Sequence, residues 1–580
     1  MVIIMTNSAL TGKPSIDKPW TKYYPSTFLD IKVPDCTLWE YLKENCPGDN
    51  IAALHYYGVD TSYKTLFEMA DAAAAGLRAL GFGEGDQIPV FLCAVPEYIY
   101  LLLAAEKIGA SLLCRDNTLE ENVDAVSKSG AKAILAHDYL SKEAADAYLS
   151  RTAVEKIVLI DPLSSGDRAA LPEHIRLNLD ANYYGKKVTG DAILTWDEFL
   201  TQGKAYKGTI EAVPDINRPL LRAYTSGSTG PSKQVIHSAH TIIGILAQLN
   251  NYAIGDGFRP VWLVTCLPPA LIAVVVAMLL LPLTSNKYLV LDPYCAPEDV
   301  DLEMMRYRPN CWPMIPLFYE IIMRSKRIPE DYDMSHLFAA GIGCESFNNS
   351  QMRRARAFFK EHNCQYMPTV GYGCSEAGSS MTMPVAEFVA GNGNIGIPMP
   401  LTDMGIFKPG THEELGYDEV GEICVSSPGI MLGYDDLKST AKVLQLHDDG
   451  KIWLHTGDIG FVKEDGFFYT MTRGESPRFG GGDLMVQPME NKIADADVPG
   501  IKDEFVVVAP DPNHKGYFLP YVYVVLHKGY TLDDVREGIV NSLAPYEHPV
   551  QIFEVPERPF FHFKTNRIGL IEELRKAVDL

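Results

Sequence analysis

The sequence predicts an α/β fold: a large N-terminal domain of mostly parallel βαβ layers with a small β-rich subdomain, followed by a small α+β C-terminal domain. Short apolar runs alternate with helical patterns over 61–136 and again after 217, which is typical of βαβ units. From about 395 to 470, short strands and glycine-rich turns replace that alternation. A chain of 580 residues also exceeds one compact core, since domains contain roughly 100–200 residues.

The N-terminal stretch shows the alternation most clearly. Apolar residues at i, i+3 and i+4 predict a helix over about 61–81, with Thr65 and Glu68 as a capping box and Gly81 at its end. The elements expected next are a strand at 88–93, a helix at 97–108, a strand at 110–114, a helix at 118–129 and a strand at 131–136.

The alternation resumes in the second half of the large domain. The expected strands are 261–267, 287–292 and 365–371, and the expected helices are 239–252, 298–306, 316–325 and 350–361. The stretch 261–284 carries no charge, and its length alone would permit a membrane span. Because Pro268, Pro269 and Pro282 interrupt it and no basic cluster flanks it, we expect a buried strand and helix instead.

The C-terminal third divides into two smaller units. We expect the β-rich subdomain at about 395–472, with the N-terminal domain as a whole covering 1–472. A glycine-rich stretch places a boundary at 473–476, and the last domain covers 473–580. Its expected elements are strands at 504–509, 521–526 and 551–555 and a helix at 531–543.

Composition excludes several classes of partner. The formal net charge is −23, so neither a nucleic acid nor an anionic membrane surface is an expected partner. The eleven cysteines contain no C-x-x-C pair, which favours a reducing compartment over a disulfide framework or a zinc site. The first twenty residues lack the basic start of a signal peptide. A cytoplasmic protein without a membrane span is therefore expected.

The most informative stretch is AYTSGSTGPSKQV at 223–235. Its hydroxyls and glycine-flanked amides suit an anion, and Lys233 adds a positive charge, so we expect a phosphate-binding loop. The order of residues differs from the Walker P-loop, in which lysine directly follows glycine. A flexible linker is the alternative, but linkers do not usually lead into a lysine and a strand-like VIHS.

Further motifs follow in a fixed order: GIGCES (341–346), GYGCSEAG (371–378), GEICVSSPGIMLGY (421–434), WLHTGD (453–458) and Arg473. Together with the loop at 223–235 they resemble the signatures of the adenylate-forming superfamily, which includes acyl-CoA synthetases, peptide-synthetase adenylation domains and luciferases. The resemblance extends over nearly the whole chain and is strongest to acyl-CoA synthetases.

The resemblance implies a role for each matching residue. The ATP phosphates would contact Thr225, Ser226, Gly227, Ser228, Thr229, Gly230 and Lys233. The adenine would lie among Gly343, Glu345, Gly371, Tyr372 and Gly373. Ser375 would contact the α-phosphate, Asp458 would accept the ribose hydroxyls, and Arg473 would add a second ribose or phosphate contact. Glu376 would hold Mg²⁺, a cation that prefers oxygen ligands.

The implied reaction has two steps. A carboxylic acid reacts with ATP to give an acyl-adenylate and pyrophosphate, and a thiol then displaces AMP. Between the steps a mobile C-terminal domain would rotate about a hinge at Glu475, and Gly481 and Gly482 would border the tunnel for the thiol. Lys233 and Glu376 would assist catalysis together with a C-terminal lysine.

The C-terminal lysine motif departs from the family pattern. Lys564 and Thr565 fit its start, but the Gly-Lys pair that should follow is missing. We take Lys564 as the catalytic lysine. If two residues are deleted here, Arg567 falls at the lysine position instead, with a different geometry.

The segment 266–276 predicts the substrate class. It contains no acid to pair with the ammonium of an α-amino acid, so Pro269, Ala270, Leu271 and Ile272 indicate an apolar pocket for an aliphatic, aromatic or alicyclic acid. Because no carrier domain follows, the expected acceptor is CoA or a separate carrier protein.

Two other functions compete with this prediction. Gly373 to Ala377 is one residue away from a G-x-S-x-G elbow, so a serine hydrolase could use Ser375 with Asp403 and His455. A binding-only homologue could keep the nucleotide site without turnover, as the altered lysine motif would allow.

Overall fold

An eight-stranded sheet forms the centre of the large body in the computed structural model, which describes residues 10–115, 118–184, 187–225, 232–250, 258–345, 347–385, 391–473, 478–479, 482–561 and 563–577. Six neighbouring strands of this sheet pair in parallel, and the two strands at one edge pair in antiparallel fashion. In spatial order the strands are β18 (Gly433–Tyr434), β9 (Gln234–Ser238), β8 (Pro219–Tyr224), β4 (Ser111–Cys114), β3 (Gln87–Phe91), β5 (Ala133–His137), β6 (Lys156–Ile160) and β7 (Ile193–Thr195).

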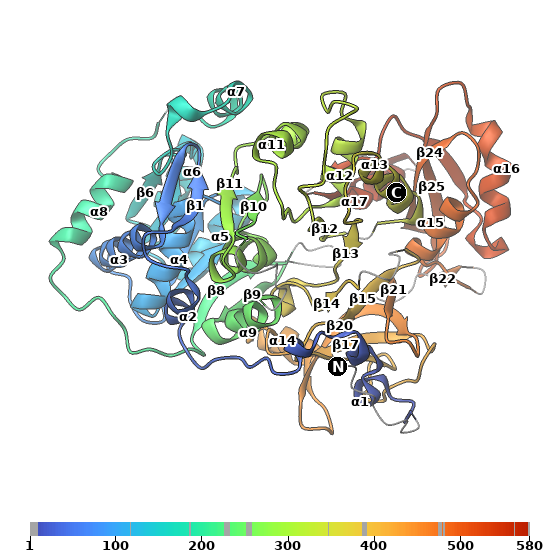
Figure 1. Ribbon diagram of the computed structural model, residues 1–580, viewed down its shortest axis with the longest axis horizontal. Coiled ribbons are helices and arrows are strands. Elements are labelled where there is room, and N and C mark those ends of the chain that lie inside the picture. The colour runs from blue at the N-terminus through green and yellow to red at the C-terminus, as the bar shows by residue number, and fades with distance from the viewer. Residues whose placement is uncertain are drawn as a thin grey trace.

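Helices cover this sheet (Figure 1), and the first three of them match the helices that the alternation predicted. They are α3 (Tyr63–Ala79), α4 (Pro96–Ile108), α5 (Leu119–Ser129), α6 (Lys142–Arg151), α7 (Glu173–Asn182) and α8 (Trp196–Ala205). The predicted capping box of Thr65 and Glu68 is wrong: Ser62 caps α3, and its Oγ accepts a hydrogen bond from the amide of Thr65 at 3.1 Å. The preceding strand ends at Ser62, so the chain turns directly from strand into helix.

A second, four-stranded sheet packs beside the first. Its order is β10 (Val261–Val264), β11 (Tyr288–Leu291), β1 (Ala52–Tyr56) and β2 (Val59–Ser62). The uncharged stretch forms β10, a π-helical turn η4 (Val274–Leu280) and α10 (Leu281–Thr284), so the predicted buried strand and helix are confirmed. Among the described helices, none has both the length and the apolar character needed to cross a membrane. The largest apolar core joins the two sheets.

Further helices precede or follow these elements in the chain, and the first of them contacts β16 (Asp403–Phe407) of the β-rich unit. These helices are α1 (Pro14–Asp17), α2 (Leu38–Asn45), α9 (Ala239–Asn250), α11 (Val300–Tyr307), α12 (Pro316–Arg324) and α13 (Asn349–Glu361). Between them, β12 (Gly341–Ile342) pairs in parallel with β13 (Thr369–Val370). The strand predicted at 365–371 is therefore shorter in the structure, where only β13 (Thr369–Val370) is a strand.

The β-rich unit is an antiparallel seven-stranded sheet. Its strands are β14 (Thr382–Met383), β15 (Asn394–Pro398), β16 (Asp403–Phe407), β17 (Gly421–Ser426), β19 (Leu444–Leu446), β20 (Ile452–Val462) and β21 (Phe468–Arg473), with α14 (Leu437–Val443) beside them. One segment expected here lies elsewhere: β18 leaves this unit and pairs with β9 in the central sheet.

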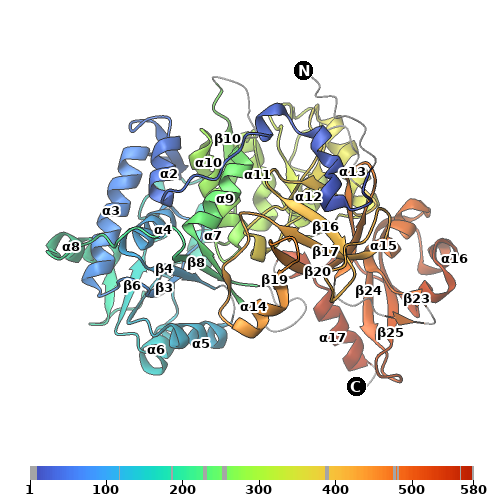
Figure 2. The ribbon, with the colours of Figure 1, turned by 90° about the horizontal axis from the view of Figure 1, so that it is seen from below.

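The last part of the chain folds around its own three-stranded sheet next to α12 and α13 (Figures 1 and 2). It contains β24 (Ile501–Pro510), β25 (Phe518–Leu526) and β26 (Gln551–Glu554), and the helices α15 (Val486–Asp495), α16 (Leu532–Ser542) and α17 (Arg567–Ala577). Short hairpins pair β22 (Arg478–Phe479) with β23 (Gly482–Asp483) and β27 (Phe560–Phe561) with β28 (Lys564–Thr565). Most of the predicted boundary at 473–476 lies outside the described residues.

Candidate active site

Two glycine-rich segments lie side by side because β12 and β13 are parallel neighbours. The amide of Gly343 donates to the carbonyl of Met314 at 3.1 Å, and the amide of Gly371 donates to the carbonyl of Ile342 at 3.0 Å. Both segments leave the carboxyl ends of their strands, where α/β folds bind ligands. A Cβ atom placed on Gly343 would meet nothing within 4 Å, so there is open space next to this backbone.

Tyr372 connects these segments to the β-rich sheet. Its hydroxyl donates to Oδ2 of Asp458 at 2.5 Å, and its amide donates to Thr382 Oγ1 at 3.1 Å. Burial, with Asp458 nearby, raises the pKa of Tyr372 well above its usual value, so the phenol is a neutral donor. In β20 and β21, Asp458 is paired with Arg473, so both predicted ribose residues lie on adjacent strands.

Glu376 and Lys233 both contact Tyr434. Glu376 lies in the short 3₁₀ helix η6 (Ser375–Ala377) and is 9% exposed. The Tyr434 hydroxyl donates to Oε1 of Glu376 at 2.6 Å, and the Lys233 ammonium lies 4.9 Å from the centre of the Tyr434 ring. A cation, an aromatic ring and a carboxylate from three separate segments thus form one cluster.

The two ends of the predicted phosphate loop are held together. The amide of Thr225 donates to the carbonyl of Lys233 at 2.9 Å, and the amide of Lys233 donates to Thr225 Oγ1 at 3.0 Å. The Ser232 hydroxyl donates to the Thr225 carbonyl at 2.6 Å. These contacts fix where the loop begins and ends, whereas Ser226, Gly227, Ser228, Thr229 and Gly230 lie outside the described residues.

His237 supports the turn that carries Ser375. Its Nε2 lies 2.9 Å from the Ser375 carbonyl oxygen, and its Nδ1 lies 3.1 Å from Thr241 Oγ1. Burial lowers the pKa of His237 to about 4, so the ring is neutral at pH 7 and can donate one proton to the carbonyl. The histidine therefore orients the backbone before Glu376.

The residues proposed for a serine hydrolase have other partners. Asp403 forms ion pairs with Lys18 and Lys451. His455 faces Glu422 through Nδ1 at 3.0 Å and another histidine through Nε2 at 3.0 Å. Because both ring nitrogens of His455 are engaged there, the geometry of a Ser-His-Asp triad around Ser375 is not assembled from these residues.

The C-terminal segment is bound to Glu345. Arg567 Nη1 lies 2.8 Å from Glu345 Oε1, and the amide of Thr565 donates to Glu345 Oε2 at 3.0 Å. Arg567 also forms an ion pair of 2.7 Å with Glu490. Lys564 is half-buried on β28, and its positive charge acts on the thiol of Cys344. The segment that carries both candidate cations thus lies against the predicted adenine side.

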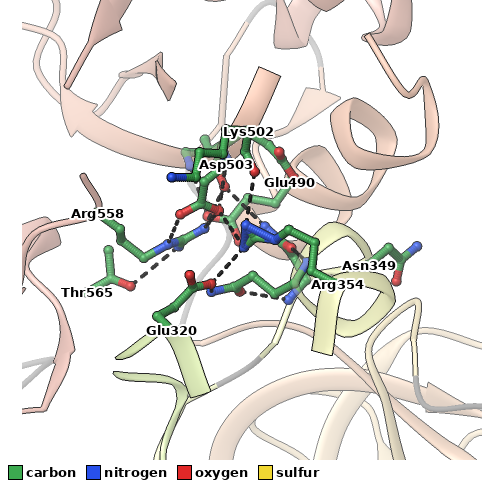
Figure 3. A network of polar contacts seen from close by, with 12 residues as sticks. Glu320, Asn349, Arg354, Glu490, Lys502, Asp503, Arg558 and Thr565 are labelled. Atoms are coloured by element: carbon green, nitrogen blue, oxygen red, sulfur yellow. Dashed lines mark hydrogen bonds and ion pairs between the residues drawn. The ribbon is translucent and has the colours of Figure 1, made fainter. Parts of the chain in front are cut away.

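A wider polar network joins the last part of the chain to the body (Figure 3). Arg354 on α13 donates to Glu320 at 2.7 Å and to the carbonyl of Lys502 at 2.9 Å. Asp503 forms a buried two-point ion pair with Arg558, with distances of 2.9 and 3.0 Å. Charged groups of α12, α13 and β24 therefore hold the C-terminal unit in this orientation.

The remaining predicted positions are placed as follows. Pro269 is buried, Ala270 and Leu271 are half-buried, and Ile272 is 1% exposed within the main core. Because core neighbours surround Ile272, the residues Ala270 and Leu271 are better placed to contact a ligand.

Gly373 passes so close to the Ser379 carbonyl that a Cβ atom would lie 1.9 Å from its oxygen. Gly482 lies in β23, whereas Glu475 and Gly481 lie outside the described residues.

Two residues of this site, Tyr434 and His237, were not predicted from the sequence. Tyr434 is the last residue of the GIMLGY segment, which the strand pattern assigned to the β-rich unit rather than to the central sheet. His237 is a polar residue inside an apolar strand, a pattern that signals a specific partner for a buried imidazole.

The open space beside Gly343, the cluster around Tyr434 and the Tyr372–Asp458 pair are features expected of an enzyme of the adenylate-forming class. Residues 43–435, more than half of the chain, match the family model described as AMP-binding enzyme, and the chain belongs to that family.

Known relatives cover almost the whole chain. A long-chain-fatty-acid–CoA ligase of Bacillus subtilis (strain 168) is 26% identical over 552 residues, which are 92% of this chain and 93% of the relative. A 4-coumarate–CoA ligase of Vanilla planifolia is 26% identical over 502 residues, covering 84% and 83%.

Solved structures show the same fold. The anthranilate CoA ligase AuaEII in complex with anthranoyl-AMP has a TM-score of 0.76 at 17% identity, with coverage of 95% of this chain and 100% of that chain. The ATP-bound MatB from Rhodopseudomonas palustris has a TM-score of 0.74 at 20% identity, with coverage of 93% and 99%. The predicted fold class is thereby confirmed.

Proposed function

We propose that this protein activates a carboxylic acid with ATP and transfers the acyl group to a thiol, most simply that of CoA. The observation that carries the proposal is the convergence of Lys233, Glu376 and the Tyr372–Asp458 pair, which come from three separate segments. Membership of the AMP-binding family and the CoA ligases among the relatives support the same reaction.

The first step forms a mixed anhydride. A carboxylate oxygen attacks the α-phosphorus of ATP, the bond to the β-phosphate oxygen breaks, and pyrophosphate leaves. Lys233 and the anchored loop would bind the phosphate charge that is released, Ser375 would contact the α-phosphate, and Asp458 would accept the ribose hydroxyls. Tyrosine hydroxyls hold the carboxylates of Asp458 and Glu376 in place, so these two groups need little reorganisation when charge moves.

Mg²⁺ fits the donors at this site. Glu376 offers a carboxylate, the ligand type that Mg²⁺ prefers, and Tyr434 orients it through Oε1. Glu376 would hold the ion, and bound Mg²⁺ would neutralise phosphate charge. The ammonium of Lys233 lies over the ring of Tyr434, and we propose that Lys233 and the ion act on the same phosphates.

The second step transfers the acyl group. The thiol sulfur attacks the acyl carbon, the carbon–oxygen bond to AMP breaks, and the thiol proton passes to solvent. We propose that 473–580 is a mobile lid with its hinge at Glu475. Lys564 would assist the first step, and Gly481 and Gly482 would border the thiol path after rotation.

Two half-buried apolar residues and the names of the relatives support a proposal for the substrate class. Ala270 and Leu271 are half-buried apolar groups, and the names of the relatives include a fatty acid and 4-coumarate. We propose an aliphatic, aromatic or alicyclic acid without an α-ammonium group. A free-standing carrier protein is the alternative acceptor.

A pyrophosphate-release screen over such acids, with and without CoA, tests the function. We expect acid-dependent pyrophosphate from ATP, and an acyl-CoA detected by mass spectrometry when CoA is present. Transfer only to a carrier protein would replace CoA as acceptor. ATP binding without pyrophosphate from any acid would indicate a binding-only homologue, and labelling of Ser375 by a serine-hydrolase probe would contradict the ligase.

A further inference from the structure

Three histidines from separate segments gather on the β-rich sheet. His455 lies on β20, His447 follows β19, and His412 lies between β16 and β17. A ring nitrogen of each lies within 4.8 Å of a ring nitrogen of the other two, and the Nε2 atoms of His447 and His455 are 3.0 Å apart. The rings of His412 and His447 stack with centroids 4.1 Å apart.

We propose that His412, His447 and His455 form a binding site for a divalent transition metal of the zinc class. Zn²⁺ binds three imidazoles readily and completes its tetrahedron with water or a carboxylate. Two ligand nitrogens about 2.05 Å from a tetrahedral ion are about 3.3 Å apart. The Nε2 atoms of His447 and His455 therefore need to move only slightly to share one ion.

Oxygen acceptors fix the orientation of two of the rings. Glu422 Oε2 lies 3.0 Å from Nδ1 of His455, so the proton belongs on Nδ1 and the lone pair of Nε2 points toward His447. Gln445 Oε1 lies 2.9 Å from Nε2 of His412, and donation to it leaves Nδ1 without a proton. Metal-binding histidines typically donate their outer N–H to such an oxygen.

The surroundings of the cluster suit a cation. His447 and His455 are buried, while His412 is exposed and leaves a route from solvent. The carboxylates of Asp448 and Asp449 act on His447 and would attract a divalent cation.

The site is linked to the nucleotide residues through β20. One carboxylate oxygen of Glu422 contacts Nδ1 of His455. The other oxygen accepts a hydrogen bond from the amide of Gly457 at 3.0 Å. Asp458 follows directly. A metal at the histidines would therefore fix the strand position of Asp458, and its role would be to stabilise and position rather than to take part in the reaction.

Metal binding is measured on the full chain purified without a histidine tag. After dialysis against EDTA, Zn²⁺ is titrated in competition with a chromophoric chelator, and bound metal is counted by mass spectrometry. We expect one Zn²⁺ per chain. His412→Ala and the double variant H412A/H447A should lose affinity by more than about 100-fold, and Glu422→Gln by roughly 10–100-fold. Because His412 is exposed, its replacement should leave the fold intact.

His514→Ala is the matched control, since His514 is exposed and pairs with Asp511 in the C-terminal unit. It should bind Zn²⁺ like the wild type. Co²⁺ in the wild type should give the visible bands of a tetrahedral site, and those bands should vanish in the double variant. The proposal is wrong if the wild type binds no more Zn²⁺ than the double variant, or if the double variant keeps one tightly bound ion.

Discussion

Glu376 is a buried carboxylate whose position depends on a single tyrosine. Tyr434 donates to one of its oxygens at 2.6 Å, and the ring of that tyrosine faces the Lys233 ammonium. A rigid phenol is suited to keep both charges apart and ready for a polyanion, because a direct Lys–Glu pair would neutralise each of them. His237 fixes the backbone one residue earlier by bonding to the Ser375 carbonyl.

We expect Lys233→Ala and Glu376→Ala each to lower the rate of adenylation by roughly 10²–10³-fold, as the removal of one charge-stabilising group typically does. Tyr434→Phe should cost less, since it only loosens Glu376. The measurement is acid-dependent ATP–pyrophosphate exchange, with the exposed Lys438→Ala on α14 as the control. Wild-type rates in both charge variants would contradict the assignment.

Substitutions at two glycines are expected to have different effects, one on ATP binding and the other on the stability of the fold. A Cβ atom on Gly343 enters open space, so Gly343→Ala should leave the melting temperature unchanged and weaken ATP binding if adenine lies there. A Cβ atom on Gly373 meets the Ser379 carbonyl oxygen at 1.9 Å, so Gly373→Ala should destabilise the fold by about 1–3 kcal/mol. Calorimetric titration with ATP and thermal unfolding distinguish the two; normal ATP affinity in Gly343→Ala would remove it from the adenine side.

Local signals predicted the residues that lie within one motif, but not the contacts between motifs. The loop at 223–235 and the Glu376 turn are recognisable from residue type and spacing alone. Tyr434 is not, because its strand is two residues long and its partner β9 lies about two hundred residues earlier. Thr65 and Glu68 have the spacing of a capping box, yet Ser62 caps the helix since the preceding strand ends there.

At the scale of elements, the hairpin of β27 and β28 positions the two candidate cations, Lys564 and Arg567, relative to the nucleotide site. Arg567 begins α17 directly after this hairpin and bonds to Glu345 and Glu490. Burial alone would lower the pKa of Arg567, but these two carboxylates more than offset it, so the guanidinium stays charged and fixed. Lys564 is on the hairpin itself. The geometry favours a docking role for Arg567 and leaves Lys564 for the reaction.

We expect Lys564→Ala to slow adenylation far more than thioester formation from a pre-made acyl-adenylate. Arg567→Ala should weaken docking of the C-terminal unit and affect both half-reactions, with partial recovery in Arg567→Lys, which keeps the charge but not the two-point geometry. Separate assays of the two half-reactions check this. If only Arg567→Ala impairs adenylation, the catalytic cation is Arg567 instead.

The alternation of apolar runs predicted the helices and strands of 61–136 and most of those after 239, because buried parallel strands and their helices have strong patterns. It could not predict how the C-terminal unit sits on the body. That orientation depends on side chains such as Arg354, Asp503 and Arg558, which have no periodicity in the sequence.

At the scale of the whole molecule, the contact between the C-terminal unit and the body buries several charges. Glu504 is 2% exposed beside the Asp503–Arg558 pair. Burial, with Asp503 nearby, raises the pKa of Glu504 from its usual 4.5 to about 8. An interface that contains such a group is sensitive to pH, because the folded protein holds a proton that the unfolded chain releases.

The sign of this effect can be tested. The folded pKa of Glu504 is raised, so its contribution to stability is complete below about pH 4.5 and is lost as the pH rises through about 8. Glu504→Gln should therefore gain stability relative to the wild type as the pH rises from 5 to 8.5. Thermal unfolding across this range is the measurement, and the exposed Glu557→Gln is the control. A difference that stays constant with pH would contradict a raised pKa.

The most direct test is a crystal structure of the protein with ATP, Mg²⁺ or Mn²⁺ and a slowly reacting acid analogue. We expect one nucleotide, with its phosphates beside Lys233 and Glu376, its base next to Gly343 and Tyr372, and its ribose hydroxyls on Asp458. A nucleotide bound elsewhere, or one that contacts the loop at 225–233 but neither Glu376 nor Asp458, would contradict the proposed site and with it the ligase reaction.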